Sequence, residues 1–226
     1  MKYILTDVEG TTTSISFVHD TLFPFAKERL KSFVEKNLAR PEVAEVLKQT
    51  KETALAELNQ TLDDSGACNL LLEWIAKDRK HAALKNLQGL IWEEGYLSGA
   101  LKGHVYKDVE PALIAWKKAG LTLGVYSSGS IKAQHQIFEF SINGNLRQYF
   151  SNHFDTGVGH KREVGSYKKI AEELKLPASE ILFLSDIKEE LDAARTAGMK
   201  TIQLVRQDDV VLGDHEVVKD FSSIKF

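Results

Sequence analysis

Short apolar runs recur along the chain, and each is bounded by polar or turn-forming residues. Four of these runs have the length of a strand: Tyr3–Leu5, Leu121–Tyr126, Ile181–Leu184 and Thr201–Val205. Runs that are continuously apolar, rather than alternating, are typical of strands buried on both faces of a parallel sheet. The pattern therefore predicts buried parallel strands at these positions.

Helical stretches precede the last three of these runs. They are Glu110–Ala119, Glu163–Leu174 and Glu189–Ala197, and each ends near a glycine or a proline before the next strand begins. Helix, short turn and strand in repetition predict an α/β fold with a doubly wound parallel sheet. Ligands of such sheets bind outside the carboxyl ends of the strands. The residues that follow each predicted strand are therefore the candidates for function.

The segment from Phe17 to Leu101 has a different pattern. Apolar residues recur there at helical spacing in four groups: Leu22, Phe25, Phe33 and Val34; Val43, Val46, Leu47, Ala54 and Leu58; Leu70, Leu71, Trp74 and Ile75; Leu84, Leu87, Ile91 and Trp92. A crossover between parallel strands needs only about a dozen residues, so the excess must pack as its own unit. We expect residues 1–16 and 102–226 to form an α/β core domain, and residues 17–101 to form a helical cap domain. The alternative is a bundle remote from the functional site.

Composition and charge exclude several classes of protein. The 29 basic and 32 acidic residues are well mixed and give a net charge of -3, which argues against a nucleic-acid partner. No apolar run approaches the roughly 18 residues of a membrane span, and Met1–Leu5 is too short for a signal peptide. The single cysteine, Cys68, excludes an intrachain disulfide and is expected to be a small buried hydrophobe. We expect a cytoplasmic protein without a membrane partner.

Two acids, Asp7 and Glu9, follow the first predicted strand and stand before Gly10 and Thr11–Thr13. A carboxylate at a strand end can act as a nucleophile or as a metal ligand, although Asp7 alone could also cap the following turn. In an extended segment, residues two apart project to the same side, so these acids would repel each other unless a cation or a shared proton lay between them. The turn itself is either an anion site built from free amides or an ordinary polar turn.

Further strand ends carry groups that suit an anionic ligand. Ser127 and Ser128 follow the second predicted strand and offer hydroxyls and amides to a phosphate. The alternative is a plain helix N-cap made by Ser128 or Ser130. Lys161 stands in a loop just before a helix, where it either neutralises a phosphate or lies solvated at the surface.

A third strand-end acid, Asp186, follows the run Ile181–Leu184. Together with Asp7 and Glu9 it supplies oxygen ligands of the hard type that suit Mg²⁺, whereas the lack of histidine among them argues against zinc. Glu190 follows on the first turn of the next predicted helix, where it could orient a metal-bound water or favour the helix N-terminus.

These residues occur in the order of the four motifs of the haloacid dehalogenase superfamily of phosphatases, which the sequence resembles. It is most similar to the enolase-phosphatase E1 family of the methionine salvage pathway, in which a glutamate stands two residues after the nucleophile. The segments that carry the resemblance are DVEGTTTSISFVHDTLFPFA, LKGHVYKDVEPALIAWKKAG, VYSSGS, FDTGVGHK and FLSDIKEELDAARTAGM. They are spread over nearly the whole chain.

The resemblance implies a bifunctional, Mg²⁺-dependent enzyme. It would convert 2,3-diketo-5-methylthiopentyl-1-phosphate to 1,2-dihydroxy-3-keto-5-methylthiopentene and phosphate, through an enediol phosphate and an aspartyl phosphate. Asp7 is then the nucleophile, Glu9 the acid and base, and Lys161 a catalytic cation that binds phosphate. Ser127 and Ser128 bind the phosphate as well. One Mg²⁺ per subunit is held by Asp7, Glu9 and Asp186, where Glu9 contributes through its backbone carbonyl, and the protein is expected to be a monomer.

The details of the enolisation stay open at the level of sequence. Its base is Glu9, Glu94 or Tyr96, and the aromatic side chains expected against the methylthio tail are those of Phe17, Phe23, Trp92 and Tyr96.

Two other functions are compatible with parts of the pattern. One is a phosphatase of the same fold that acts on another small phosphate ester. The other is a phospho-ligand-binding or regulatory protein on a decayed enzyme fold, which predicts that the nucleophile, the acid or the metal acid is missing. Asp7, Glu9 and Asp186 are all present, so the sequence favours an enzyme.

Overall fold

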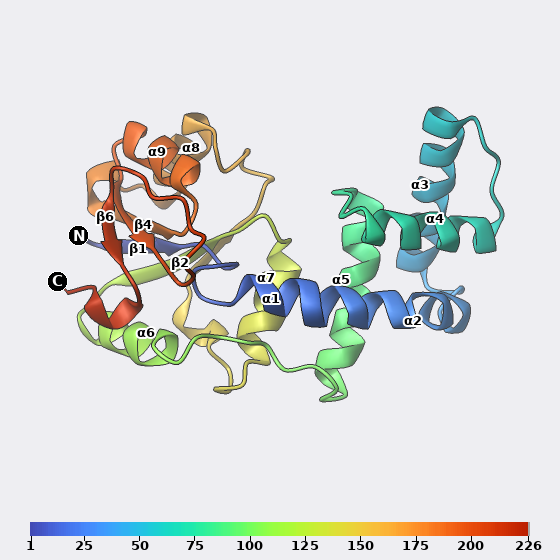
Figure 1. Ribbon diagram of the computed structural model, residues 1–226, viewed down its shortest axis with the longest axis horizontal. Coiled ribbons are helices and arrows are strands. Elements are labelled where there is room, and N and C mark those ends of the chain that lie inside the picture. The colour runs from blue at the N-terminus through green and yellow to red at the C-terminus, as the bar shows by residue number, and fades with distance from the viewer. Residues whose placement is uncertain (226) are drawn as a thin grey trace. The chain divides into compact units, whose positions relative to one another are not determined.

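The computed structural model describes residues 1–225 and contains a parallel β-sheet flanked by helices (Figure 1). The strands are β1 (Tyr3–Thr6), β2 (Thr122–Tyr126), β3 (Asn152–Phe154), β4 (Ile181–Ser185), β5 (Lys200–Leu204) and β6 (Glu216–Val218). They form a 6-stranded sheet in the order β3-β2-β1-β4-β5-β6, and every neighbouring pair is parallel. The predicted α/β fold with a doubly wound sheet is confirmed.

The helices fall into two groups along the chain. Between β1 and β2 lie α1 (Ile15–Phe17), the π-helical turn η1 (Val18–Leu22), α2 (Phe23–Lys36), α3 (Pro41–Leu58), α4 (Asp64–Ala76), α5 (Ala82–Leu97) and α6 (Val109–Lys118). After β2 lie α7 (Ile131–Glu139), α8 (Val164–Leu174) and α9 (Lys188–Thr196), with 3-10 turns η2 (Arg147–Tyr149), η3 (Ala178–Glu180) and η4 (Phe221–Ser223). The predicted helical insertion between the first two strands is therefore present.

The strand order places a topological switch point beside β1. The chain runs outward from β1 through β2 to β3, and then returns to β4 on the other side of β1 before it continues to β5 and β6. Ligands of doubly wound sheets bind at this kind of crevice, at the carboxyl ends of the two strands where the winding reverses. In this protein those ends are followed by Asp7 and Asp186.

Helices α8 and α9 lie on one side of the sheet and α6 lies on the other (Figure 1). The core between the sheet and the α8–α9 layer is aromatic, with Tyr3, Tyr126, Tyr167 and Phe183 buried together. Gly124 makes this packing possible, because a Cβ at that position would overlap the phenol of Tyr3. Burial of large aromatic side chains supplies much of the apolar area that stabilises such a core.

Two strands of the sheet were not predicted from the sequence, namely β3 and β6. Each has three residues, and β3 carries Asn152 and His153 while β6 begins with Glu216. Both are edge strands of the sheet, so they need fewer apolar residues than central strands. Their sequences lack the continuous apolar run that identified the other four.

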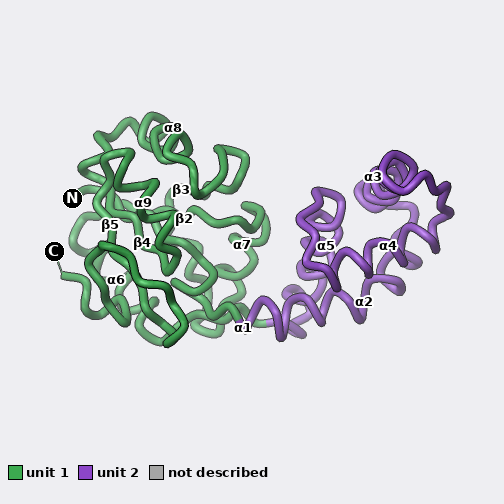
Figure 2. Tube along the Cα trace, turned by 45° about the horizontal axis from the view of Figure 1, so that its top comes forward, with its two compact units in different colours: residues 1–15, 102–226 green, residues 16–101 purple. Residues whose placement is uncertain are grey.

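The chain divides into two compact units, shown in different colours in Figure 2. One unit comprises Met1–Ile15 and Lys102–Phe226, and the other comprises Ser16–Leu101. Within the helical unit, α2, α3, α4 and α5 bury apolar side chains from each of the four predicted helical groups. Cys68 is a buried free cysteine in this unit. No helix within residues 1–225 is both long and apolar enough to cross a membrane.

Candidate active site

The ends of three neighbouring strands bring Asp7, Ser127 and Asp186 to one edge of the sheet. Asp7 follows β1 and donates its backbone N–H to the Leu184 carbonyl at 2.8 Å, and Ser127 follows β2 and donates its own to the Phe154 carbonyl at 3.2 Å. The three residues are buried, with exposed fractions of 3%, 0% and 4% in that order. Side chains that lie far apart in the sequence are thus assembled by strand order.

Lys161 is buried and joins two carboxylates at this edge. Its Nζ lies 2.5 Å from Asp7 Oδ1 and 2.6 Å from Glu190 Oε2, and its exposed fraction is 3%. Burial by itself lowers the pKa of the ammonium, but the carboxylates of Asp7 and Glu190 outweigh burial, so its pKa is raised above the ordinary value. Lys161 is therefore charged near neutral pH, and its alternative as a solvated surface lysine does not apply.

The Asp7 carboxyl experiences opposing influences. Burial raises its pKa above the ordinary range, the Lys161 ammonium lowers it, and the negative charges of Glu190, Glu9 and Asp186 raise it further. Acidic groups thus outnumber the ammonium around this carboxyl, which indicates that the site would gain from another cation. A cation supplied with the ligand or as a metal would restore the ionised form of Asp7.

Lys161, in the loop between β3 and α8, is held by residues of α8 and α9. The Tyr167 hydroxyl, on α8, donates to the Lys161 carbonyl at 2.6 Å. The partner carboxylate of Glu190, on α9, accepts from the Ser185 hydroxyl at 3.0 Å, and that hydroxyl in turn accepts the Ile187 N–H at 3.1 Å. The backbone of Lys161 and the carboxylate of Glu190 are therefore each held by a further hydrogen bond within the unit.

Glu9 reaches toward the end of β2. Its Oε2 accepts a hydrogen bond from the Ser127 hydroxyl at 3.0 Å, and Ser127 Oγ accepts the Gly129 N–H at 3.0 Å. Ser130 caps α7 by accepting the Ala133 N–H at 3.2 Å, so the N-cap expected among these serines is Ser130. Asp7 and Glu9 therefore stand at the same strand end but are held by different partners.

The turn after β1 is shaped around Asp186. Gly10 has a φ of +76°, and a Cβ there would overlap the Asp186 carboxylate, so only glycine allows this close approach. The Thr11 hydroxyl donates to Asp186 Oδ1 at 3.3 Å and accepts the Asp186 N–H at 3.1 Å. Burial raises the pKa of Asp186 to about 6, although hydrogen bonding and Lys161 oppose the shift.

The acidic side chains fit a hard divalent cation that is bound by few protein groups. Within residues 1–225, no three His, Cys, Asp or Glu side chains are grouped so as to hold a metal ion. Mg²⁺ is commonly held by one or two carboxylates together with substrate phosphate and water. Asp7 and Asp186 offer two buried carboxylates at the switch point, and oxygen donors without sulfur or imidazole suit Mg²⁺ rather than zinc.

Two residues that hold this site together were not identified as such from the sequence. Glu190 was expected on the first turn of α9, but not as the partner of Lys161. Gln134, on α7, donates from Nε2 to the Gly129 carbonyl at 3.2 Å and to the Phe154 carbonyl at 2.7 Å. Its exposed fraction is 1%. The sequence carries a weak signal for the first, since Glu190 follows Asp186 at helical spacing, and none for the second.

The fold and the strand-end carboxylates are those of a haloacid dehalogenase-like hydrolase, and residues 1–198 match that family. An enolase-phosphatase E1 of Pseudomonas savastanoi pv. phaseolicola is 52% identical over 224 residues, covering 99% of this chain and 97% of the relative. An enolase-phosphatase E1 of Picosynechococcus sp. is 48% identical over 224 residues, covering 99% and 98%. The chain belongs to the enolase-phosphatase E1 family and is a phosphatase.

A solved structure of a relative has the same fold as this chain. The crystal structure of the UTR4 protein from Saccharomyces cerevisiae superposes with a TM-score of 0.81 at 34% identity, and the match covers 99% of each chain. The structure of CbbY from Rhodobacter sphaeroides in complex with phosphate superposes with a TM-score of 0.57 at 18% identity. The latter likeness concerns the fold alone.

Proposed function

We propose that this protein converts 2,3-diketo-5-methylthiopentyl-1-phosphate to 1,2-dihydroxy-3-keto-5-methylthiopentene and phosphate in the methionine salvage pathway. The observation that carries the proposal is the arrangement of Asp7, with the Lys161 ammonium at 2.5 Å and the Glu9–Ser127 pair on the adjoining strand end. The family relationship supports the choice of substrate.

Phosphate release begins at Asp7. One carboxylate oxygen attacks phosphorus, the bond from phosphorus to the leaving oxygen breaks, and an aspartyl phosphate forms. Glu9 gives a proton to the leaving oxygen. The Lys161 ammonium, the Ser127 hydroxyl and the Ser128 amide bind the other phosphoryl oxygens and oppose the charge that develops on them. Lys161 is suited to this role because it is charged and held in place before the substrate binds.

The second half of the hydrolysis regenerates Asp7. Glu9, now deprotonated, takes a proton from a water molecule as that water attacks phosphorus. The bond from phosphorus to Asp7 breaks and inorganic phosphate leaves. Before the substrate binds, the hydrogen bond from Ser127 to Glu9 at 3.0 Å holds this carboxylate beside the phosphate site.

One Mg²⁺ per subunit would be held by the carboxylates of Asp7 and Asp186 and by the backbone carbonyl of Glu9. When bound, the ion neutralises charge on the phosphoryl oxygens and on an enolate oxygen. Ligation by the backbone leaves the Glu9 side chain free for proton transfer, and it requires the turn that Gly10 allows beside Asp186.

The enolisation requires a base that removes a proton from the carbon next to a carbonyl. Burial raises the pKa of Tyr96 above its ordinary value, which opposes a role as a base near neutral pH. Glu94 is exposed on α5, and Glu9 already lies at the phosphate site. The structure favours a carboxylate over the tyrosine, and both glutamates remain candidates for this step.

The apolar tail is expected to contact aromatic side chains of the helical unit, which would then act as a cap. Trp92 is in the core of that unit, where its Nε1–H donates to the Leu22 carbonyl at 2.8 Å, and Tyr96 is also buried. Phe17 and Phe23 are partly exposed and are therefore the better candidates for contact with a ligand.

The decisive experiment follows the purified protein with the diketone phosphate and Mg²⁺, recording enediol absorbance and free phosphate together. Formation of the enediol with stoichiometric phosphate is expected, together with loss of both products on removal of Mg²⁺ by a chelator. Phosphate release without any enediol would instead support a phosphatase for another small phosphate ester. No turnover of any phosphate ester would support the phospho-ligand-binding alternative.

Replacement of the nucleophile tests the covalent step. Asp7→Asn should lower phosphate release by at least about 10⁴-fold, because removal of a nucleophile leaves only the rate that binding and charge provide. Asp209→Asn, at an exposed position of the same unit, is the matched control and should retain full activity. Unchanged phosphate release by Asp7→Asn would contradict the aspartyl-phosphate mechanism.

A further inference from the structure

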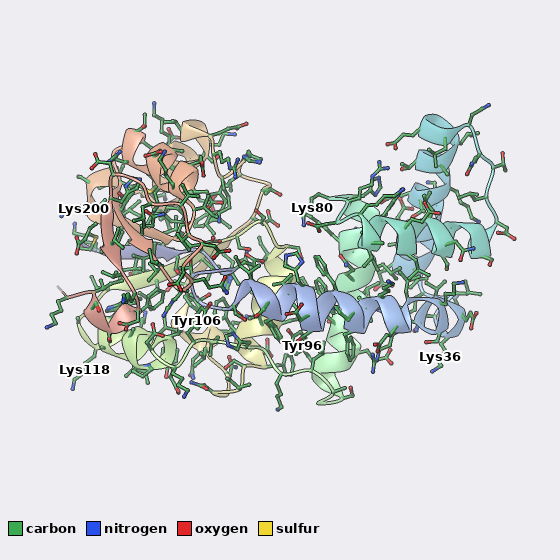
Figure 3. The ribbon with its side chains drawn as sticks, viewed as in Figure 1. Lys36, Lys80, Tyr96, Tyr106, Lys118 and Lys200 are labelled. Carbon is green, nitrogen blue, oxygen red and sulfur yellow. The ribbon has the colours of Figure 1, made fainter. Side chains whose placement is uncertain are left out.

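Arg206 is a buried arginine that none of the proposed steps uses. It follows β5, and its side chain is 5% exposed. Its Nη1 and Nη2 donate to the two carboxylate oxygens of Asp108, both at 2.8 Å. The guanidinium also lies 4.3 Å from the ring centroid of Tyr106, which is labelled in Figure 3, and 5.1 Å from that of Phe221. A bidentate ion pair between aromatic rings holds a guanidinium in one orientation.

Further hydrogen bonds connect this guanidinium to the turn after β1, while Nη1 also donates to the Lys219 carbonyl at 3.4 Å. Arg206 Nε donates to the Thr11 carbonyl at 3.1 Å, and Nη2 donates to the same oxygen at 2.9 Å. The hydroxyl of Thr11 is meanwhile engaged with the Asp186 carboxylate and N–H. A single threonine thus connects Arg206, through its backbone oxygen, to Asp186, through its side chain.

The ion pair of Arg206 and Asp108 (the clamp) is itself held by residues other than Thr11. The Phe221 N–H donates to Asp108 Oδ2 at 2.7 Å, and the Phe221 ring packs on Trp116 with centroids 5.0 Å apart. The Tyr106 N–H donates to the Thr12 carbonyl at 3.0 Å, which ties the next residue of the turn to the same segment. Arg206 therefore contacts the turn while its partner Asp108 is held by packing between α6 and η4.

Arg206 holds the turn from outside, in addition to the turn's own hydrogen bonds from the N–H groups of Thr11, Thr12 and Thr13 to the Val8 carbonyl. Asp7 makes the last hydrogen bond of this segment to β4, and Gly10 then has a left-handed backbone, which glycine adopts readily because it lacks a Cβ. The same turn carries Glu9, whose carbonyl and side chain have roles in the proposed mechanism. A rotation of the Thr11 peptide would move the Thr11 hydroxyl away from Asp186 and change the position of the Glu9 carbonyl.

We propose that Arg206, held by Asp108, is a positioning residue that fixes the Glu9–Thr11 turn against Asp186 and thereby sets the geometry for Mg²⁺ and for phosphoryl transfer. This inference rests on the proposed function, since it adds to that site a positioning residue, Arg206, from the end of β5. Residues that orient the metal-ligating groups, without contacting the metal themselves, change metal affinity or activity by roughly 10- to 100-fold when they are removed.

Three variants separate this role from simple stabilisation. Arg206→Met removes both hydrogen bonds from Arg206 to the Thr11 carbonyl. Arg206→Lys keeps the positive charge but not the bidentate guanidinium. Asp108→Asn weakens the ion pair with Arg206 and leaves the residues of the turn unchanged. The matched control is Arg79→Met. Arg79 also makes a bidentate pair, with Glu57 at 2.7 and 2.8 Å, and lies over the Trp74 ring at 4.5 Å, but it is in the helical unit.

For each variant the measurements are the melting temperature, the Mg²⁺ dissociation constant by calorimetry without substrate, and kcat and KM at saturating Mg²⁺. In Arg206→Met we expect the dissociation constant to rise about 10- to 100-fold and kcat to fall by a similar factor, with KM changed less than about threefold. Arg206→Lys and Asp108→Asn should show smaller losses of the same kind. Arg79→Met should change only the melting temperature.

A lowered melting temperature with unchanged Mg²⁺ affinity and kcat in the Arg206 variants would overturn the proposal, because the clamp would then be purely structural. Failure of all three variants to fold, or lack of Mg²⁺ binding by the unaltered protein, would overturn it as well. The two proposals fail separately. If the unaltered protein does not turn over the diketone phosphate while Arg206→Met still weakens Mg²⁺ binding, the substrate assignment fails and the positioning role stands.

Discussion

Lys161 contacts two buried carboxylates, so one positive charge faces two negative charges at this site. Asp7 and Glu190 contact the ammonium at 2.5 and 2.6 Å, and all three side chains are at most 10% exposed. Removing one member of a buried ion pair is costly because it leaves an uncompensated charge in a medium of low polarity. The cluster therefore contributes to stability only as long as it is complete.

Replacement of the lysine tests this balance. Lys161→Met should lower the free energy of unfolding by about 3–5 kcal/mol, because it leaves two carboxylates facing each other without a cation. Adding Glu190→Gln should recover part of the loss, since it removes one of the two charges. Urea denaturation monitored by circular dichroism measures both effects. A double variant no more stable than the single one would contradict the account.

The environment of His153 opposes a positive charge on its imidazole. Its Nδ1–H donates to Gln134 Oε1 at 3.1 Å, while its Nε2 is buried and has no hydrogen-bond partner in the described part of the chain. Burial lowers its pKa from 6.5 to about 4, and the neighbouring His135 and Arg147 add to the effect. The folded protein therefore takes up this proton less readily than the unfolded chain.

The sign of the resulting pH dependence follows from proton counting. Between pH 6.5 and 4 the unfolded histidine is protonated and the folded one is neutral, so this residue makes stability fall as the pH decreases. Relative to His153→Gln, the unaltered protein should lose on the order of 1 kcal/mol across this window, after allowance for partial solvent screening. Denaturation at pH 7 and at pH 4.5 provides the comparison. An NMR titration of His153 near its ordinary pKa would contradict it.

At the residue scale, the sequence predicted the groups that directly follow a strand. Asp7, Ser127 and Asp186 were identifiable because parallel strands present their carboxyl ends at one edge. Lys161 was a weaker prediction, because a loop lysine is usually solvated and only the packing of Tyr167 and Glu190 around it makes it buried. Glu190, Gln134 and Arg206 act through contacts with distant residues, which a linear pattern does not contain.

At the scale of elements, the loop between β2 and α7 depends on α7 for its shape. Gln134 bonds to the carbonyls of Gly129 and Phe154 and accepts from His153. It thereby ties the serine loop to the end of β3. The short strand β3, which the sequence did not reveal, is therefore part of the support for the serine loop, the proposed phosphate-binding site.

Replacement of this glutamine should loosen the serine loop. Gln134→Leu is expected to raise the inhibition constant of inorganic phosphate about 10-fold, and to lower stability by about 1–3 kcal/mol because buried polar groups lose their partner. Gln148→Leu is the matched control, since Gln148 also donates to a backbone carbonyl, that of Asn145, but is exposed. An unchanged inhibition constant in Gln134→Leu would show that the loop holds its shape without α7.

At the scale of the whole molecule, the helical unit is inserted where two segments of the core unit meet. Residues Thr13 and Ser14 leave the core, and His104 lies on the segment that returns to it. His104 Nδ1 accepts the Ser14 N–H at 3.2 Å and lies 3.0 Å from Thr13 Oγ1. An insertion between closely spaced ends imposes little strain on the domain that receives it.

Removal of the insertion tests how the two units divide the work. A variant in which a short Gly/Ser linker replaces residues 16–101 should fold, with one cooperative unfolding transition, because the core unit keeps its sheet and its own aromatic core. It should still hydrolyse p-nitrophenyl phosphate, dependent on Asp7. Turnover of the diketone phosphate should fall by at least about 10-fold, since contacts with remote parts of a substrate contribute to catalysis. An unfolded circular dichroism spectrum would contradict the independence of the core.

The sequence by itself determined the α/β class, the helical insertion, and the strand-end residues Asp7, Ser127 and Asp186. These features depend on local periodicity and on the order of elements, which a linear pattern records. The tertiary structure alone decided that Lys161 is buried between two acids, that Glu9 bonds to Ser127, and that Arg206 supports the turn beside Asp186. Those arrangements depend on which distant segments come into contact, and burial then sets the charge of each group.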